Sequence, residues 1–352
     1  MSVIKRWIKI FITAIFIFIL TLCLLEVLIR VFRFPHLDVE PRYFYIHDDL
    51  LGWKLAENNH VVLHTSEYHT DVQTNSQGFR DREHSQIKPE GTYRILGLGD
   101  SFTFGFGVEG EETYLVQMEK KLNDMTDRKI TYEIINMGIP GYSFLQESLL
   151  FKEKAIQYQP DMVMIGFDVN DHVDSLEPFH VPYDGFLLRA ESVQQPFIKE
   201  RLFLSRHFKS VHLILRGVEL LYEYLHSGDE TSASKRSQEA LNFVEKRLQI
   251  MSQISHEKGI RLVLFFIPHR GQVHPGWFKE PSFYRYFDDL EKRLSEICAQ
   301  HGVLYIDLLP ELLRVAQKGE RLYFKADGHW NSRGHQVAAD YLLGELKKRG
   351  IL

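Results

Sequence analysis

Cysteine is nearly absent from this chain of 352 residues, which has only Cys23 and Cys298. Cys23 lies in an apolar N-terminal stretch, so the rest of the chain has one cysteine and cannot form an internal disulfide. This excludes a scaffold held together by disulfides and argues against a thiolate metal site. Histidine clusters with metal-ligand spacing are absent as well, so the sequence predicts no metal.

The chain also lacks internal repeats, low-complexity tracts and an excess of basic residues. Its net charge is −5 at pH 7; residues 1–34 carry +4, which leaves −9 for the remainder. An acidic remainder argues against nucleic acid or an anionic membrane surface as the main partner. Hydrophobic residues make up 44% of the chain and charged residues 25%, so no disordered class is indicated.

One long apolar run stands near the N-terminus. Residues 10–25 carry no charge, and a basic cluster over residues 5–9 precedes them. The run is close to the roughly 20 apolar residues that a helix needs to span a bilayer. The positive-inside rule places the N-terminus in the cytoplasm, although Arg30 and Arg33 follow the run. We predict an uncleaved signal-anchor, a single-pass membrane protein and an extracytoplasmic catalytic domain, in the periplasm or at the cell surface.

Three alternatives for this run stay open. A cleaved signal peptide would have a shorter apolar core and a small-residue cleavage site, and no A-x-A pattern follows. A lipoprotein signal would use Cys23, but the bulky Leu22 precedes it. A buried core helix fits poorly with apolar residues on every face.

From Tyr93 onward, strand-like and helical patterns alternate. Short apolar runs predict strands, and apolar residues at helical spacing predict helices. This alternation is typical of a parallel sheet with helices on both faces. The predicted strands are 94–99, 131–137, 161–167, 260–268 and 302–308, and the predicted helices are 112–122, 143–157 and 332–348.

Two segments fall outside this alternation. Residues 35–90 show little helical period and predict loops and short strands that approach and cover the core. An insertion at about 172–235 contains an amphipathic run from Val211 to Leu225 and a predicted loop over Ser227–Ser232. Both a lid over the site and a helix that extends the core fit this insertion. The predicted division is a cytoplasmic tip and transmembrane helix over 1–34, an approach segment over 35–90 and a catalytic domain over 91–352.

A serine follows the first predicted strand at a turn of small residues. Ser101 comes directly after the apolar run Ile95–Gly99 and Asp100. The carboxyl edge of an open α/β sheet is where ligands bind, and a serine there needs a base to become a nucleophile. We predict Ser101 as the nucleophile, His329 as the general base and Asp327 as the acid that orients His329.

Donors for a developing oxyanion follow two other predicted strands. Gly138 would let its backbone N–H approach a ligand closely, and the side-chain amide of Asn170 can donate a hydrogen bond. With the backbone N–H of Ser101, these groups form the predicted oxyanion hole.

Nearby polar residues receive structural or peripheral roles. Asp100 is predicted to order the turn before Ser101 rather than to transfer a proton. His335 is predicted on the surface of the last helix, and His172 and His269 are candidates to line the substrate cleft.

Four sequence blocks in this order resemble those of the SGNH (GDSL-type) hydrolase superfamily. They are GDSFTFG with Ser101, NMGIPG with Gly138, DVND with Asn170 and DGHW with His329. The resemblance covers about residues 90–350. It implies a flavodoxin-like three-layer α/β/α fold with a parallel sheet, ester or acyl-group chemistry, and no cofactor.

Two further features qualify this resemblance. Asp168 stands where the third block usually has glycine, which puts the local turn and the charge beside the acyl pocket in doubt. Asn75–Arg80 resembles a segment of membrane-anchored bacterial members that act on cell-surface glycans.

The predicted function is that of a serine esterase that acts on an O-acyl ester, either in a small molecule or in an acylated surface glycan. The same residues would serve an O-acyltransferase of exopolysaccharide, since the two reactions share an acyl-enzyme. A non-catalytic glycan-binding subunit on the same fold is the third hypothesis.

Overall fold

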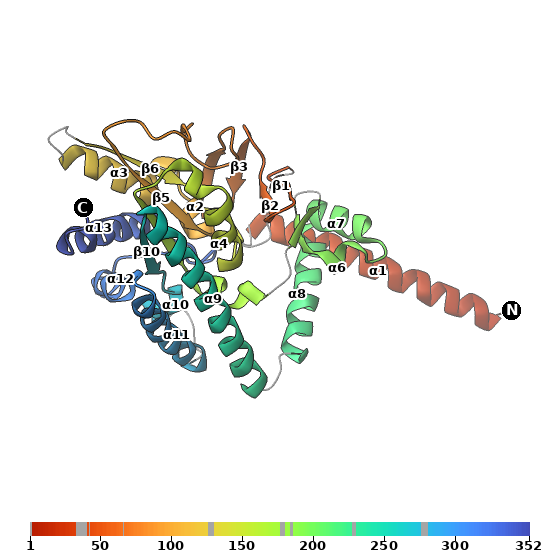
Figure 1. Ribbon diagram of the computed structural model, residues 1–352. Coiled ribbons are helices and arrows are strands. Elements are labelled where there is room, and N and C mark those ends of the chain that lie inside the picture. The colour runs from red at the N-terminus through yellow and green to blue at the C-terminus, as the bar shows by residue number, and fades with distance from the viewer. Residues whose placement is uncertain are drawn as a thin grey trace.

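Five parallel strands form the central sheet of the computed structural model (Figure 1). Their order is β11-β10-β7-β5-β6, so the chain starts inside the sheet and winds outward in both directions. This is the strand order of flavodoxin-like folds, and the predicted fold class is confirmed. The strands are β5 (Thr92–Gly99), β6 (Thr131–Asn136), β7 (Met162–Phe167), β10 (Arg261–Phe266) and β11 (Leu304–Asp307).

The structure describes most of the chain. The predicted border between anchor and approach segment, at residues 34 and 35, lies outside the described residues, as does the side chain of Asn170. The described ranges are 2–32, 41, 43–65, 67–125, 130–176, 180–183, 186–226, 230–275 and 281–352.

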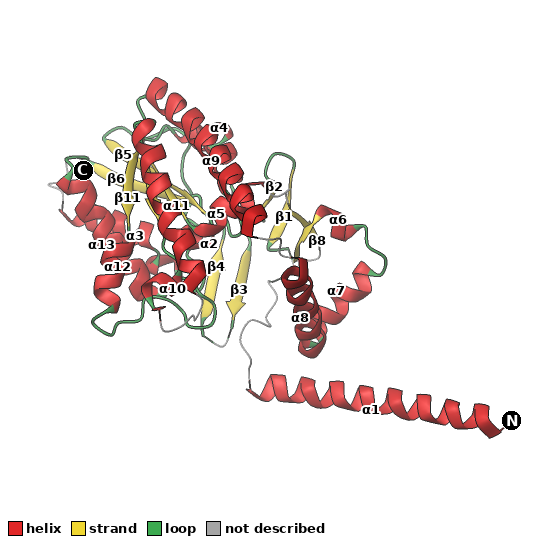
Figure 2. Ribbon diagram, turned by 90° about the horizontal axis from the view of Figure 1, so that it is seen from below, coloured by secondary structure: helices red, strands yellow, loops and turns green. Residues whose placement is uncertain are grey.

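Helices cover both faces of the sheet because successive strand residues point to opposite sides (Figure 2). Leu96 and Leu98 pack with helices α4, α9 and α11, whereas Ile95 packs with α3, α12 and α13. The result is a three-layer domain with two apolar cores. The helices are α3 (Tyr114–Met125), α4 (Phe144–Glu153), α9 (Glu230–Lys258), α11 (Pro281–Gln300), α12 (Leu309–Ala316) and α13 (Ser332–Lys348).

Short helices follow the strands at their carboxyl ends. α2 (Ser101–Phe104) follows β5, α5 (Val169–Val173) follows β7 and α10 (Arg270–Val273) follows β10. This edge therefore collects the chain segments that carry the predicted catalytic residues. Three 3₁₀ helices complete the described domain: Gly110–Glu112, Ala155–Tyr158 and Asp174–Leu176.

One predicted loop is partly wrong. Residues 230–232 begin α9, whereas residues 227–229 lie outside the described part. The helix buries Ala240, Val244 and Leu248 at helical spacing against the sheet. This packing outweighs the low helix propensity of the residues at its start.

Two antiparallel hairpins precede the sheet. Trp53 and Val72 are buried in the same apolar core as α4 and α9. The hairpins therefore pack onto the domain. They are β1 (Tyr45–Asp48) with β2 (Gly52–Leu55), and β3 (His60–His64) with β4 (His69–Gln73).

The N-terminal helix α1 (Ser2–Phe32) leaves nearly all of its side chains exposed. Among the described residues, Val3–Phe32 is the one segment long and apolar enough to cross a membrane. The alternative of a buried core helix is therefore wrong, because the apolar side chains do not contact the core. The exposed surface is consistent with a single-pass membrane anchor.

The insertion forms a hairpin and three helices. α7 and α8 pack against each other, and α8 also contacts α1 (Figure 1). The predicted amphipathic run over residues 211–225 is helical and lies within α8. The elements are β8 (His180–Tyr183), β9 (Phe186–Arg189), α6 (Ala190–Val193), α7 (Ile198–His207) and α8 (Lys209–His226).

Candidate active site

Ser101 is the first residue of α2, directly after β5. The Asp100 carboxylate caps this short helix by accepting a hydrogen bond of 2.9 Å from the Phe102 N–H. Asp100 therefore orders the turn, as its sequence position predicts. The turn leaves the Ser101 hydroxyl partly exposed at the carboxyl edge of the sheet.

The structure brings the three predicted catalytic side chains together. Ser101 Oγ lies 2.7 Å from His329 Nε2. The other ring nitrogen, His329 Nδ1, forms a hydrogen bond with Asp327 Oδ1. A nucleophile bonded to a base, with the base bonded to an acid, is the arrangement that activates a serine.

The Ser101 hydroxyl has a second acceptor nearby. Asp100 Oδ2 lies 3.2 Å from Ser101 Oγ, which is longer than the contact with His329. A hydroxyl has one proton to donate, and the shorter distance favours His329 as its acceptor.

The surroundings of His329 hold its proton tightly. Burial alone would lower the pKa of His329, but the hydrogen bond and charge of Asp327, with the charge of Asp100, raise it above the ordinary value. The rings of Phe102 and Phe106 each lie 5.1 Å from the imidazole, centroid to centroid. These rings shield the imidazole from water and strengthen its interaction with Asp327.

The segment between β3 and β4 reaches the catalytic loop. Tyr68 Oη donates a hydrogen bond of 2.9 Å to Asp327 Oδ2, the oxygen that His329 leaves free. The Glu67 carboxylate accepts hydrogen bonds from the backbone N–H groups of Lys325, Ala326 and Asp327, at 2.9, 2.8 and 2.9 Å. Sequence reasoning missed both residues, since nothing local links position 67 or 68 to position 327.

Arg270, at the start of α10, holds the same loop from its other side. Its guanidinium donates to the carbonyls of Lys325 and Ala326, at 2.9 and 3.0 Å. With Glu67 on the N–H groups and Arg270 on the carbonyls, the backbone before His329 is fixed by two opposite charges.

Arg80 fixes the loop that follows Ser101. Its buried guanidinium donates hydrogen bonds of 2.7 Å to the carbonyls of both Gly105 and Val108. Burial, against the weaker opposing charges of Glu109, Glu111 and Glu112, lowers the pKa of Arg80 to about 10, so it keeps its charge at neutral pH. The approach segment therefore braces both halves of the site.

The Gly138 N–H, which the sequence predicts as an oxyanion donor, already has an acceptor in the structure. That N–H donates to Asn136 Oδ1 at 2.9 Å and is buried. A Cβ at position 138 would lie 2.4 Å from the Phe104 nitrogen. The glycine is needed because β6 and the helix that carries Ser101 pack closely here.

Gly141, three residues later, is exposed and has an N–H with no acceptor among the described residues. Its φ of +79° and the hydrogen bond from the Tyr142 N–H to the Ile139 carbonyl define a turn with Pro140 and Gly141 at its centre. The Pro-Gly pair is the sequence signal that could have identified this turn. The other predicted donor, the Asn170 amide, lies outside the described residues.

His335 is buried, contrary to its predicted surface position. It is 1% exposed, and its Nδ1 accepts a hydrogen bond from the Tyr114 N–H. Burial lowers its pKa to about 3, so the ring is neutral. His335 therefore joins α13 to α3 and has no place in the cleft.

The two candidate cleft histidines have structural contacts. His172 is fully buried and bonds through Nε2 to the Ser237 carbonyl of α9, so it does not line a cleft. His269 caps α10 by accepting a hydrogen bond from the Gly271 N–H. Burial and the charge of Arg270 lower the pKa of His269 to about 4.

A pair of buried carboxyl groups lies behind the site. Glu147 on α4 and Asp171 on α5 are fully buried beside each other. Burial, and the proximity of other carboxyl groups including Asp100 and Asp168, raise both pKa values well above the usual range. No N–H or hydroxyl of the described residues donates to either oxygen of Glu147, which agrees with a protonated pair.

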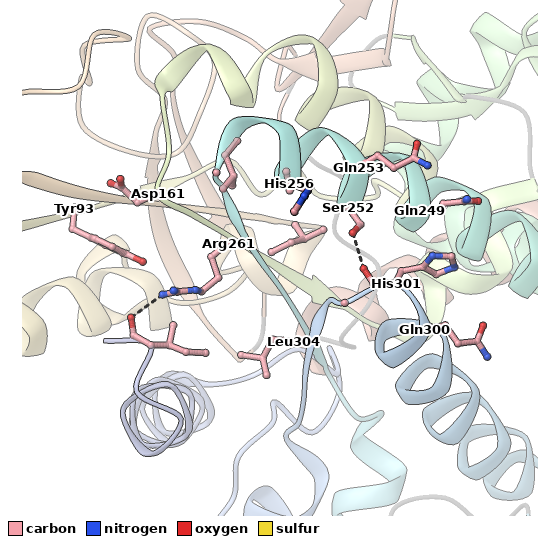
Figure 3. A pocket seen from close by; sticks show the side chains of 16 residues that line it. Tyr93, Asp161, Gln249, Ser252, Gln253, His256, Arg261, Gln300, His301 and Leu304 are labelled. Atoms are coloured by element: carbon pink, nitrogen blue, oxygen red, sulfur yellow. Dashed lines mark hydrogen bonds between the residues drawn. The ribbon is translucent and has the colours of Figure 1, made fainter.

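A polar cavity of about 870 Å³ lies at the opposite edge of the sheet (Figure 3). Tyr93, Arg261 and Leu304, at the starts of three strands, line it. It is therefore separate from Ser101. Among the described residues, no group of three His, Cys, Asp or Glu side chains is placed to hold a metal ion.

A three-layer domain with Ser101, His329 and Asp327 at the carboxyl edge resembles SGNH hydrolase-like proteins, and a family model supports this resemblance over part of the chain. Residues 223–351 match the family model described as "SGNH hydrolase-like domain, acetyltransferase AlgX". The matched stretch contains Asp327 and His329 and begins after Ser101.

Part of the chain is also similar to a curated protein. The chain is 24% identical over 130 residues to the "Probable alginate O-acetylase AlgJ" of Azotobacter vinelandii. The alignment covers 37% of this chain and 33% of the relative, so the chain spans about a third of the length of that protein.

Similar solved structures include several esterases. The acetyl xylan esterase AlAXEase has 17% identity and a TM-score of 0.44, over 72% of this chain and 99% of that one. TesA has 14% identity and a TM-score of 0.41, over 72% and 98%. A catalytic mutant of Axe2 from Geobacillus stearothermophilus has 18% identity and a TM-score of 0.44, over 72% and 94%.

Tyr68→Phe tests whether the approach segment positions the catalytic acid. The change removes the hydrogen bond to Asp327, and such bonds to charged groups contribute about 1.5–3 kcal/mol. We expect kcat/KM for 4-nitrophenyl acetate to fall about tenfold. The less satisfied carboxylate should hold the His329 proton more tightly, so the acid limb of the pH profile should move to higher pH.

Tyr305→Phe is the matched control, because the buried Tyr305 hydroxyl has no hydrogen-bond partner among the described residues. An unchanged rate in Tyr68→Phe, or a lower rate with an unmoved acid limb, would contradict the positioning role.

Glu147→Gln tests the protonated pair. The folded chain keeps this proton while the unfolded chain releases it above the ordinary carboxyl pKa, so the free energy of unfolding of the wild type should decrease as the pH rises above that ordinary value. For each proton that only the folded chain holds, the free energy of unfolding decreases by about 1.4 kcal/mol per pH unit. The melting temperature of Glu147→Gln should depend less on pH, as followed by circular dichroism. The exposed Glu153→Gln on the same helix should keep the wild-type slope, and an equal slope in Glu147→Gln would refute the assignment.

Proposed function

We propose that this protein is a membrane-anchored O-acyltransferase that moves an acyl group through Ser101 to a hydroxyl of an exported polysaccharide. The observation that carries the proposal is the chain of hydrogen bonds from Ser101 through His329 to Asp327. The choice of a sugar acceptor over water is supported by the similarity of residues 223–351 to the AlgX acetyltransferase model, and by the similarity to AlgJ. This reverses the order of the sequence-based prediction, which put hydrolysis first.

The first half-reaction loads the enzyme. Ser101 Oγ attacks the acyl carbonyl of an ester donor as its proton passes to His329 Nε2, and Asp327 stabilises the imidazolium that forms. The tetrahedral intermediate then collapses, the bond to the donor alcohol breaks, and His329 returns the proton to that alcohol. The acyl group remains on Ser101 as an ester.

The second half-reaction unloads it. A sugar hydroxyl gives its proton to His329 Nε2 and attacks the acyl carbonyl. The bond to Ser101 Oγ breaks, and the serine recovers its proton from His329. If water replaces the sugar hydroxyl, the same steps give ester hydrolysis.

The oxyanion donors in this proposal are the Ser101 N–H, the Asn170 side-chain amide and the Gly141 N–H. Gly141 replaces Gly138, whose N–H is already bonded to Asn136. A loop N–H that is exposed and has no acceptor among the described residues is free to receive a developing negative charge.

We further propose that α1 is an uncleaved signal-anchor with its N-terminus in the cytoplasm. The basic cluster over residues 5–9 supports this orientation through the positive-inside rule. The catalytic domain would then meet its polysaccharide outside the cytoplasm, with residues 35–90 joining the anchor to the domain.

An acyl-transfer assay on the full-length protein tests the function. Wild-type protein in detergent is given 4-nitrophenyl acetate with and without alginate oligosaccharides, and the sugars are analysed by mass spectrometry. We expect acetylated sugar with the wild type, and no acetylated sugar with Ser101→Ala, because the acyl-enzyme cannot form.

The control is Ser252→Ala, whose serine lies in the cavity at the opposite edge of the sheet and should keep full transfer. Acetate release without sugar acetylation would support an esterase instead. If Ser101→Ala turned over the donor as fast as the wild type, the catalytic role of Ser101 would be refuted and the binding-subunit hypothesis favoured.

A further inference from the structure

The two longer insertion helices, α7 and α8, expose several large apolar side chains. Phe203 is 53% exposed on α7, and Val218 and Leu221 are 60% and 57% exposed on α8. Soluble surfaces rarely keep contiguous large apolar side chains in water. We call this set the insertion face: Phe203, Leu204, Leu213, Ile214, Val218 and Leu221.

The exposed residues of α8 share one side of the helix. At 100° per residue, Leu213, Ile214, Val218 and Leu221 fall within an arc of about 140°. Gly217, also exposed, lies within this arc and adds no polar group. From Leu213 to Leu221, the described residues of this side of the helix therefore carry no polar side chain.

Polar contacts attach this helix to the anchor. The Glu26 carboxylate of α1 accepts hydrogen bonds from the N–H groups of Lys209 and Ser210, at 3.2 and 2.7 Å, and so caps the start of α8. Arg30 bonds to Glu26 at 2.7 Å and donates to the His207 carbonyl at 3.0 Å. The junction of α7 and α8 is thus fixed to the last turns of α1.

The position along α1 at which the junction of α7 and α8 is attached determines how deep the junction would lie in a bilayer. From Lys9 to Arg30 the helix rises about 31 Å, close to the thickness of the hydrocarbon core of a bilayer. Glu26 and Arg30 would then lie near the headgroups on the far side from the N-terminus. In Figure 1, α8 runs across the direction of α1 rather than along it. A helix that starts at headgroup level and runs across the anchor lies in the plane of the membrane surface.

We propose that the insertion face is embedded in the outer surface of the same bilayer that α1 crosses, so that α7 and α8 form a second, in-plane membrane contact. This rests on the anchor proposed above. The contact is apolar, so it needs no anionic lipid and is compatible with the acidic net charge of the domain. One helix leaves a domain free to rotate about its linker, whereas two contacts fix the orientation of the catalytic edge over the membrane.

Site-specific labels on the full-length protein in nanodiscs, one copy in each disc, test this proposal. Cys298 is buried and its burial raises its pKa to about 12, so a maleimide dye does not react there. Cys23 is exposed on α1 and can be labelled itself or replaced by serine. An environment-sensitive dye is placed at Val218→Cys or Leu221→Cys, with Ile87→Cys, an exposed apolar position of the approach segment, as the matched control.

Dyes at positions 218 and 221 should shift their emission to the blue and lose most of it when the lipids carry a spin-label quencher, and the dye on Ile87→Cys should do neither. The dye on Cys23 reports the anchor separately. One outcome would overturn the proposal and leave the membrane anchor supported. In this outcome the dye on Cys23 is quenched by the lipids, whereas the dyes at positions 218 and 221 show neither a blue shift nor quenching. A blue shift at 218 and 221 without lipid quenching would also overturn it, because protein rather than lipid would then cover the face. No quenching at position 23 would overturn both the anchor and this proposal.

Discussion

The hydrogen bond between Ser101 and His329 joins two segments that are 228 positions apart in the chain. Neither segment alone fixes the distance between the Ser101 hydroxyl and the His329 ring. Ser101 depends on the end of β5 and the capped turn after it, and His329 depends on the loop before α13. The parallel sheet brings both to one edge, but a sheet sets positions only to within the freedom of its loops. A bond of 2.7 Å requires the loops to be held as well.

Much of that restraint comes from the approach segment, residues 35–90, which contains none of the predicted catalytic residues. Arg80 bonds to backbone carbonyls after Ser101, while Glu67 and Tyr68 bond to the loop that carries Asp327. These contacts use charged or strongly polar groups on backbone or carboxylate partners in a partly buried setting, where such bonds are strongest. The approach segment is therefore better described as part of the active site than as a linker.

Much of this architecture could be predicted from the sequence because hydrophobic periodicity reports the faces of strands and helices directly. The sequence points to Ser101, Asp327 and His329 because each follows a predicted strand or precedes a predicted helix, and the structure brings their side chains together. Gly138 was not assigned correctly, since a motif does not show which N–H already has an acceptor. Glu67 could not have been found, because its contacts depend on tertiary packing. The buried position of His335 could have been found, because it shares a helical face with the other buried residues of α13.

The most direct test of the active-site assignment is the labelling of the full-length protein by a fluorophosphonate probe, with the labelled residue located by mass spectrometry and the rate followed across pH. The account predicts one label, on Ser101. It also predicts a labelling rate that declines below a pKa higher than that of an ordinary histidine, because His329 must be neutral to accept the proton. Absence of labelling, or labelling of Ser101→Ala at the wild-type rate, would contradict an activated Ser101.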